Sequence, residues 1–282
     1  MSNYSDKLPD VQHDIDPRGI EIDNAGICDL IIPISVKRKD SEINCDTVAT
    51  VKCTVKVPST QKGTNMSRLP IYIQTNTPDN LTLNKLKSYC SEICKIAETE
   101  YCSLEYDFPY FLMKNSPVEM IPGLVHYKVN FYTDYNSIAQ IFTQKIRVSV
   151  IASTCCPCSK LISLYNAHNQ KCYIDLEITL NQEDSNIIWL EDLIKICEDS
   201  ASCEIYSILK RPDEKFVTEK MYDRPRFVED VVREVCVNLK NNYNKYMITD
   251  FKVKATADES IHMHKAIASI SGSFSKLEII KG

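Results

Sequence analysis

The chain has 282 residues, of which 44% are hydrophobic and 25% charged, so it is long enough for one large or two medium globular domains. Its net charge of -5 excludes a generally basic nucleic-acid binder, and an anionic ligand would need a local basic patch. The opening MSNYSDKLPD lacks the basic and apolar regions of a signal peptide, and the apolar run CDLIIPISV is too short to span a bilayer. We therefore expect a cytoplasmic protein without a membrane or nucleic-acid partner.

The first half of the chain combines strand patterns with one helical pattern. Apolar residues recur at helical spacing in LTLNKLKSYCSEICKIAETE, which predicts a helix over 81–100. Alternation of apolar and polar residues predicts four strands around it, near residues 27–36, 47–57, 104–113 and 124–132.

The second half repeats this arrangement. Helices are predicted at 186–198, with a cap signal at Ser185 and Asn186, and at 225–242, which opens with a proline. Strands are predicted at 144–152, 171–180, 247–256 and 264–271. In the 171–180 strand, one face is expected to carry Cys172, Ile174, Leu176, Ile178 and Leu180.

Each half therefore reads as two strands, helical structure and two further strands. This order predicts an α+β protein built from a tandem pair of antiparallel units with helices packed on one face. The join is expected near 134–142, which gives units of 1–138 and 139–282. No sequence repeat relates the two halves, so the duplication rests on the pattern alone.

The segment TCCPCSK, residues 154–160, holds three of the 13 cysteines. An odd number of cysteines cannot all pair within one chain, and a reducing compartment keeps thiols free. The segment could still be core filler, a nucleophile or a metal site. Cys156 followed by His168 could share a Zn²⁺-like ion, but the spacing is not that of a structural zinc site.

Two further groups of polar residues allow a functional and a structural interpretation. In ESIHMHK, His262 and His264 are two residues apart and face the same way if the segment is a strand. The charged segment 209–234 reads as a solvated loop leading into a helix, or as a source of two functional acids, Glu214 and Glu229. Glu229 could equally be a first-turn acid that interacts with the helix dipole.

The segment STQKGTNMSR, residues 59–68, is a basic loop that could bind phosphate through Lys62 and Arg68. It is not a P-loop, because the required spacing of glycine and lysine is missing.

In this order, the segments resemble the type IB GTP cyclohydrolases, metal-dependent enzymes of the tunnelling fold. The resemblance runs from about residue 9 to about residue 265. It is carried by DPRGIEIDNAGICDLIIPISV, KGTNMSR, CPCSKLIS, AHNQK, LKRPDEKFVTEKMYDRPRFVEDVVR and ESIHMH.

The resemblance implies a tandem pair of tunnelling-fold units, a homotetramer closed into an oligomeric barrel, and active sites between subunits. It also implies that GTP and water give formate and 7,8-dihydroneopterin triphosphate, the first step toward folate-type pterins. One divalent metal per site is implied, and zinc, manganese and iron all suit a cysteine, histidine and carboxylate ligand set.

Residue roles follow from the same resemblance. The metal ligands would be Cys156, His168 and Glu214. An acid/base cluster would contain Glu259, His262 and His264, with Cys156 and His168 also catalytic. Glu229 would anchor guanine through N1–H and the 2-amino group, which adenine lacks. Candidates for binding the triphosphate are Lys62, Arg68, Lys160, Lys210 and Arg211.

The chain departs from the family pattern at four positions. Asn65 stands where the family usually has a histidine, and asparagine cannot transfer a proton near neutral pH. Cys155 replaces a leucine, Asn166 a glycine and Lys171 an arginine. None of these removes a proposed metal ligand.

Alternative functions are related enzymes or a binding protein. A cyclic-phosphate-forming GTP cyclohydrolase is a close relative, and a deazapurine nitrile reductase also uses a cysteine and a glutamate, without a catalytic metal. The histidines of AHNQ and HMH favour metal-assisted water over the reductase. A non-catalytic purine-binding paralogue gains support from Asn65 alone.

Overall fold

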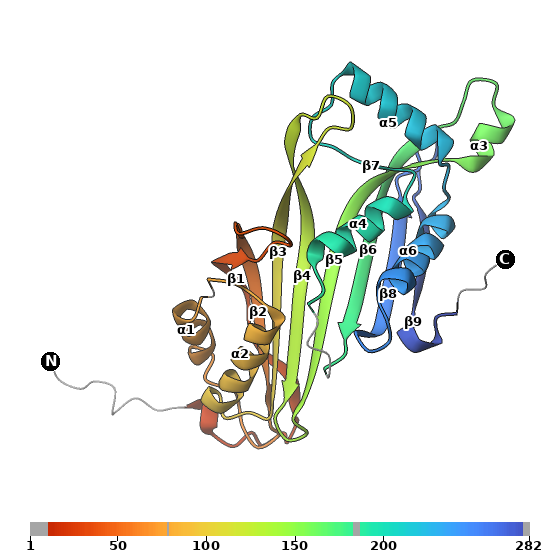
Figure 1. The fold of residues 1–282 in the computed structure, drawn as a ribbon. Helices are drawn as coiled ribbons and strands as arrows, with labels where there is room; N and C mark the ends of the chain where they lie inside the picture. The colour runs from red at the N-terminus through yellow and green to blue at the C-terminus, as the bar shows by residue number, and fades with distance from the viewer. Residues whose placement is uncertain (1–10, 78, 183–186, 279–282) are drawn as a thin grey trace. The chain divides into compact units, whose positions relative to one another are not determined.

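The computed structural model describes residues 11–77, 79–182 and 187–278 (Figure 1). Within these residues the chain forms two compact units. The first contains the described residues of Met1–Val36, Asp46–Asp107 and Phe131–Thr143, and the second contains those of Lys37–Cys45, Phe108–Asn130 and Gln144–Gly282. The expected units of 1–138 and 139–282 differ from these two units in where they assign residues 37–45, 108–130 and 139–143. The strands β3 and β4 run from one unit into the other.

The first unit follows the predicted order of two strands, helical structure and two strands. Its strands hydrogen-bond in the order β1, β2, β3, β4, and α2 buries Leu86, Cys90, Ile93 and Cys94. The short helix α1 was not predicted from the sequence. The elements are β1 (Ile22–Val36), β2 (Cys45–Val57), α1 (Arg68–Thr75), α2 (Leu83–Ile96), β3 (Tyr101–Asn115) and β4 (Pro122–Asn136).

The second unit has the strand order β5, β6, β8, β9, with the short β7 paired to β5. Helices α4 and α6 pack against each other, α4 on β6 and α6 on β8 and β9 (Figure 1). The elements are β5 (Ile141–Cys155), α3 (Pro157–Ile162), β6 (Asn169–Leu180), α4 (Leu190–Ser200), β7 (Cys203–Glu204), α5 (Arg211–Asp223), α6 (Val228–Asn242), β8 (Ile248–Ala257) and β9 (Ala266–Ser273).

The predicted α+β class with antiparallel strands is confirmed. Between the named strands, each register that the structure describes is antiparallel. Four of the five residues predicted for the inner face of β6 are fully buried, from Cys172 to Ile178, whereas Leu180 is half-buried. The predicted helix cap at Ser185 and Asn186 lies outside the described residues, and α4 begins at Leu190.

All thirteen cysteines are free thiols, as expected. Most of them are buried and act as small apolar side chains of the core. In the part of the chain that the structure describes, no helix has the length and apolar character needed to span a membrane.

The charged segment that reads as a loop in the sequence contains a helix, α5, so that interpretation was wrong. Asp213 caps its start: the buried carboxylate accepts hydrogen bonds from the backbone N–H groups of Val118, Glu119 and Lys210, at 2.8, 3.0 and 2.9 Å. Burial alone would raise the pKa of Asp213, but these hydrogen bonds lower it to about 2. The first turn of α5 is therefore fixed to the hairpin of β3 and β4.

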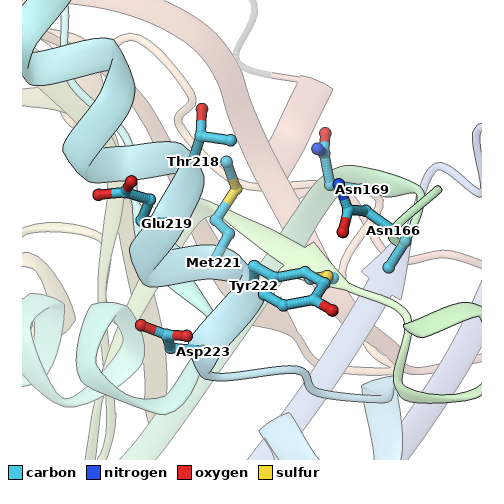
Figure 2. A pocket seen from close by; sticks show the side chains of 9 residues that line it. Asn166, Asn169, Thr218, Glu219, Met221, Tyr222 and Asp223 are labelled. Atoms are coloured by element: carbon cyan, nitrogen blue, oxygen red, sulfur yellow. The ribbon is translucent and has the colours of Figure 1, made fainter. Parts of the chain in front are cut away.

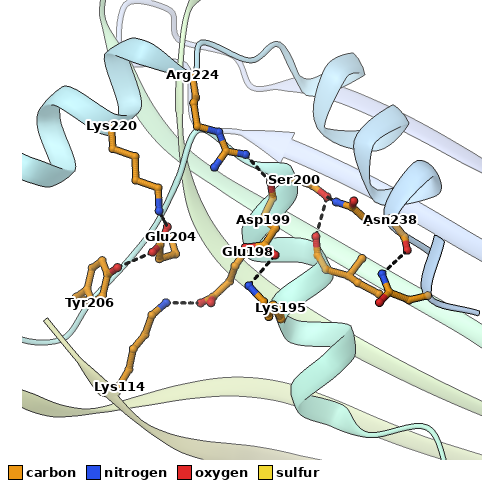
Figure 3. A network of polar contacts seen from close by, with 12 residues as sticks. Lys114, Lys195, Glu198, Asp199, Ser200, Glu204, Tyr206, Lys220, Arg224 and Asn238 are labelled. Atoms are coloured by element: carbon orange, nitrogen blue, oxygen red, sulfur yellow. Dashed lines mark hydrogen bonds and ion pairs between the residues drawn. The ribbon is translucent and has the colours of Figure 1, made fainter. Parts of the chain in front are cut away.

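A second anchor of α5 is a network of ion pairs (Figure 3). Lys220 donates to Glu204 Oε2 at 2.6 Å, and Tyr206 donates to the other carboxylate oxygen. Burial opposes ionisation of Glu204, yet these two donors lower its pKa to about 2. Beside them, Lys114 and Tyr127 donate to Glu198 Oε1 at 2.8 and 2.9 Å. The first group ties α5 to β7, and the second ties α4 to the hairpin. The two groups meet where Lys114 Nζ lies 4.7 Å from the centre of the Tyr206 ring.

We expect Lys220→Met to reduce the free energy of unfolding by about 1.5–3 kcal/mol, because it removes a charged hydrogen-bond donor from a partly buried carboxylate. Urea denaturation would measure the loss. Adding Glu204→Gln should recover part of it by removing the unpaired charge. The matched control is Lys215→Met on the same helix, whose partner Glu219 is exposed, and which should change stability by less than about 1 kcal/mol. Equal losses at both lysines would contradict the proposed anchor.

Candidate functional site

The thiol of Cys156 lies where β5 ends and α3 begins. Cys156 is the N-cap of α3, and its Sγ accepts the backbone N–H of Ser159 at 3.5 Å. Pro157 occupies the first helical position, where a missing N–H is harmless. The side chain is partly exposed, whereas Cys155 before it is buried and Cys158 after it is exposed. Of the three thiols, Cys156 is the one held at a fixed and accessible position.

His168 is fixed beside Cys156 through the backbone. The N–H of Cys156 donates to the carbonyl oxygen of His168 at 3.1 Å. The Ser159 hydroxyl donates to the Cys156 carbonyl at 3.2 Å and accepts the N–H of His168 at 3.3 Å. This arrangement extends the β5–β6 ladder, whose last pair is Cys155 with Asn169. The backbone therefore places Cys156 and His168 side by side, while their sharing of a metal ion stays a prediction.

Glu259 also lies beside His168. It follows the end of β8, where Asp258 N–H donates to the carbonyl of Lys171 at 2.9 Å. Its Oε2 is 4.0 Å from His168 Nδ1, and its Oε1 accepts from Gln170 Nε2 at 3.3 Å. Three polar side chains, His168 just before β6, Gln170 in β6 and Glu259 in the β8–β9 turn, therefore meet at one place.

His262 and His264 lie in the turn between β8 and β9 and are exposed. The sequence placed His264 in a strand, which is wrong because β9 begins at Ala266. The rings nevertheless lie on the same side, stacked with centroids 4.9 Å apart and an interplanar angle of 19°. The N–H of His262 donates to the carbonyl of Glu259 at 3.1 Å, which ties this turn to the cluster around His168.

Glu214 is exposed in the first turn of α5, next to the buried Asp213. Among the residues that the structure describes, no three His, Cys, Asp or Glu side chains form a group that could hold a metal. The chain thus brings Cys156 and His168 together, but it does not gather them with Glu214. The three-ligand set stays a prediction.

Glu229 lies exposed in the first turn of α6. The carboxylate that caps this helix is Asp230, which accepts the N–H of Phe227 at 3.0 Å. Just before it, the N–H of Arg226 donates to the carbonyl of Cys155 at 2.9 Å. This bond holds the beginning of α6 against the end of β5, one residue from Cys156.

The five predicted phosphate-binding cations differ in their surroundings. Lys62 pairs with Asp14 at 3.0 Å, and Arg68 donates to the carbonyl of Ile96 at 2.6 Å and to Glu98 at 3.1 Å, all in the first unit. The other three belong to the second unit.

Lys160 donates to the carbonyl of Tyr222 at 2.7 Å and lies 4.1 Å from the centre of its ring, near the end of α5. Lys210 and Arg211 are exposed at the start of that helix. Lys160 therefore stabilises the end of α5 in this conformation, whereas Lys210 and Arg211 face solvent.

A cavity of about 450 Å³ lies next to the cysteine segment (Figure 2). One side is formed by the last turns of α5 and the other by the loop that leads into β6. Its lining residues are Cys155, Asn166, Ala167, Asn169, Thr218, Glu219, Met221, Tyr222 and Asp223. The sequence analysis missed the α5 residues. The signal for that helix was Pro212 followed by Asp213, a common start of a helix.

Asn166 explains one departure from the family pattern. Its φ is +79°, in the left-handed region that glycine adopts most easily and asparagine tolerates. The backbone at this position therefore keeps the conformation for which a glycine is suited. Cys155, which replaces a leucine, is buried, and burial raises the pKa of its thiol.

The fold and the site together define an α+β protein with a cysteine and a histidine at the adjoining ends of two antiparallel strands. Residues 8–268 match the family model described as type I GTP cyclohydrolase folE2. Because this match covers most of the chain, the protein belongs to that family.

Curated relatives agree with this assignment. Proteins named GTP cyclohydrolase FolE2 from Methylobacillus flagellatus and Thermosipho africanus are each 39% identical to the chain. The alignments cover 93% and 94% of this chain and 95% and 98% of those proteins. The protein of that name from Syntrophobacter fumaroxidans is 41% identical over 94% of this chain and 99% of its own length.

Among solved structures, urate oxidase from Bacillus subtilis 168 is similar with a TM-score of 0.49 and 9% identity, covering 90% of this chain and 100% of that one. A likeness at this level carries no functional argument.

We expect Asn166→Val to lower the stability by about 1–2 kcal/mol, because a β-branched residue is strained at positive φ. Asn166→Gly should leave the stability within about 0.5 kcal/mol of the original. Thermal denaturation of both variants would measure the effect. The control is Asn169→Val, which lines the same cavity but lies at the start of a strand. An equal loss at Asn166 and Asn169 would show that backbone conformation is not the cause.

Proposed function

We propose that this protein is a GTP cyclohydrolase I, which converts GTP and water to formate and 7,8-dihydroneopterin triphosphate. The observation that carries the proposal is the backbone hydrogen bond that sets Cys156 beside His168, in a chain of the type I GTP cyclohydrolase FolE2 family. Relatives that are 37–41% identical over nearly their whole length bear that name. A cytoplasmic location and a role in folate-type pterin synthesis belong to the same proposal.

One divalent ion, zinc, manganese or iron, is proposed to bind at Cys156 and His168. A thiolate and an imidazole suit all three metals. The donors fit because Cys156 is partly exposed and because His168 uses Nδ1 for its contact with Gln170, at 2.9 Å, so that Nε2 can face a ligand. Glu214 is the proposed carboxylate ligand. Lewis-acid activation of the water that attacks guanine C8 is the chemistry that such an ion supplies.

The remaining steps use proton transfer and hydrogen bonds from this chain. His262 and His264 are proposed to protonate the ring nitrogen as C8 is attacked and to assist the release of formate. Their exposed, stacked rings are tied by the backbone to Glu259, the third member of this acid/base cluster. Glu229 is proposed to accept hydrogen bonds from guanine N1–H and the 2-amino group, which selects guanine over adenine.

The triphosphate is proposed to bind to cations at the start of α5, where Lys210 and Arg211 face solvent. Lys160 donates to the Tyr222 carbonyl, and its ammonium group has further N–H donors with which it can join them. Lys62 and Arg68 complete the proposed set.

We also propose that the protein is a homotetramer. Each chain would contribute a tandem pair of tunnelling-fold units to a barrel closed between subunits, and the active sites would lie at the subunit interfaces. Four large apolar residues lie almost fully exposed directly after the Cys156 segment, and burial against another subunit would remove them from water. They are Leu161, Ile162, Leu164 and Tyr165, with exposed fractions of 87, 81, 94 and 92%. A site shared between subunits also accounts for the lack of three gathered metal ligands among the described residues of one chain.

Incubation of the purified protein with GTP and Mn²⁺, Zn²⁺ or Fe²⁺ tests the activity, with formate and pterin fluorescence as readouts. Cys156→Ala should abolish turnover, because it removes a proposed metal ligand. Cys155→Ala should keep most of it, since that thiol is buried. An active wild type with equal loss in both variants would mean that the wrong thiol is assigned. No product with any metal would refute the enzyme proposal.

Glu229→Gln should raise the Kd for GTP at least tenfold, because an amide cannot accept both guanine hydrogen bonds, while the metal content stays unchanged. Titration with GTP and elemental analysis of the same sample would measure the two quantities. The control is Glu234→Gln on the same helix, a side chain that pairs loosely with Arg226 at 3.8 Å. Release of metal by Glu229→Gln would instead place this carboxylate in the ligand shell.

A further inference from the structure

Gln170 contacts both the proposed metal-binding imidazole of His168 and the carboxylate of Glu259. Its Oε1 is 2.9 Å from His168 Nδ1, and its Nε2 donates to Glu259 Oε1 at 3.3 Å. The side chain is 8% exposed, so the amide has little access to water. His168 directly precedes β6, and Gln170 is the second residue of that strand. The bond from Cys156 N–H to the His168 carbonyl continues the β5–β6 ladder, and in such an extended backbone side chains two residues apart point to the same side.

The two contacts fix the direction of the amide. An ionised carboxylate only accepts hydrogen bonds, so Gln170 must present its NH₂ group to Glu259. Its carbonyl oxygen then faces His168 and accepts a hydrogen bond from Nδ1. The imidazole must therefore carry a proton on Nδ1 when it is neutral, which leaves the lone pair on Nε2. The Ser260 hydroxyl, 3.4 Å from Nδ1, can donate or accept and does not set the tautomer.

We infer that Gln170 is a positioning residue that holds His168 in its Nδ1–H tautomer, with Nε2 directed toward the metal site, and that Glu259 acts on His168 through Gln170. The inference rests on the proposed function in one respect, which is that His168 binds a metal. A hydrogen bond from the second nitrogen of a metal-binding histidine typically fixes ring orientation, and its loss weakens metal binding by roughly 10–100-fold.

This arrangement changes the role of Glu259. Both of its oxygens face the pair, one bonded to Gln170 and one 4.0 Å from Nδ1. A carboxylate in this position stabilises the amide and the imidazole on the Nδ1 side and does not reach the Nε2 edge of the ring. The acid/base function then falls to His262 and His264, and Glu259 supports them through the backbone bond to His262.

Nitrogen-15 NMR of the metal-free protein tests the tautomer directly. The signals of His168 among the five histidines can be assigned with a His168→Asn variant. The wild type should show Nδ1 protonated and Nε2 unprotonated at a pH where the ring is neutral. Gln170→Leu should lose this single form, because the acceptor for Nδ1–H is gone. Retention of the same tautomer in Gln170→Leu would overturn the inference.

Metal affinity provides the second readout, measured by competition with a chromophoric chelator for Zn²⁺. Gln170→Leu should weaken binding by about 10–100-fold. The matched control is Gln144→Leu, the same change at a residue also 8% exposed. In β5, the residue that pairs with Gln170 is Thr154. Gln144 lies ten residues before Thr154, or roughly 34 Å away along the strand, and is therefore remote from His168. The control should change affinity by less than about threefold.

A double variant tests whether Glu259 affects metal binding through Gln170 or independently of it. If Glu259 acts through Gln170, then Gln170→Leu with Glu259→Leu should bind Zn²⁺ within about threefold of Gln170→Leu alone, because coupled residues are not additive. A further large loss of Zn²⁺ affinity in the double variant would show that Glu259 contributes independently, and would overturn the inference that it acts through Gln170. If the wild type binds no metal but shows the expected tautomer change, the positioning role is supported and the proposed metal is not.

Discussion

The antiparallel pairing of β5 with β6 is the constraint on which the site depends. Its register runs from Lys145 with Thr179 to Cys155 with Asn169, and the bond from Cys156 N–H to the His168 carbonyl continues it. A slip by one residue would turn every side chain of β6 to the opposite face. The buried row from Cys172 to Ile178 prevents that slip, so the apolar core of the second unit also sets the position of the imidazole.

Much of the fold could be predicted because its periodicity is strong. The strands and the helices α2, α4 and α6 have one clearly apolar face, and burial of that face decides their structure. Helix α5 lacks this signal, since Asp213 is its only fully buried side chain. It is held by polar contacts with β7 and with the β3–β4 hairpin, and such long-range contacts leave no periodic trace in the sequence.

The site was only partly predictable for a related reason. The nearness of Cys156 and His168 follows from a strand, a turn and a returning strand, which the local pattern indicates. The approach of Glu259 requires β8 to pair with β6, as it does between Cys172 and Ala257, and sequence spacing does not give that pairing. Gln170 stood inside a recognised motif without an assigned role, because only coordinates show that its two ends contact different groups.

The acidic residues of the charged segment can be sorted by what surrounds them. Asp213 and Asp230 accept backbone N–H groups at helix starts, and Glu204, which lies in β7 before the segment, accepts from Lys220 and Tyr206. The carboxylate oxygens of these residues accept hydrogen bonds that stabilise the fold. Removing these side chains would leave backbone N–H groups at the helix starts, or a lysine, without an acceptor. Glu214 and Glu229 stand next to two of these capping residues yet face solvent. In both helices, the capping acid therefore fixes the backbone while its neighbour presents a carboxylate outward, as the proposed roles of Glu214 as a metal ligand and of Glu229 as an anchor for guanine would require.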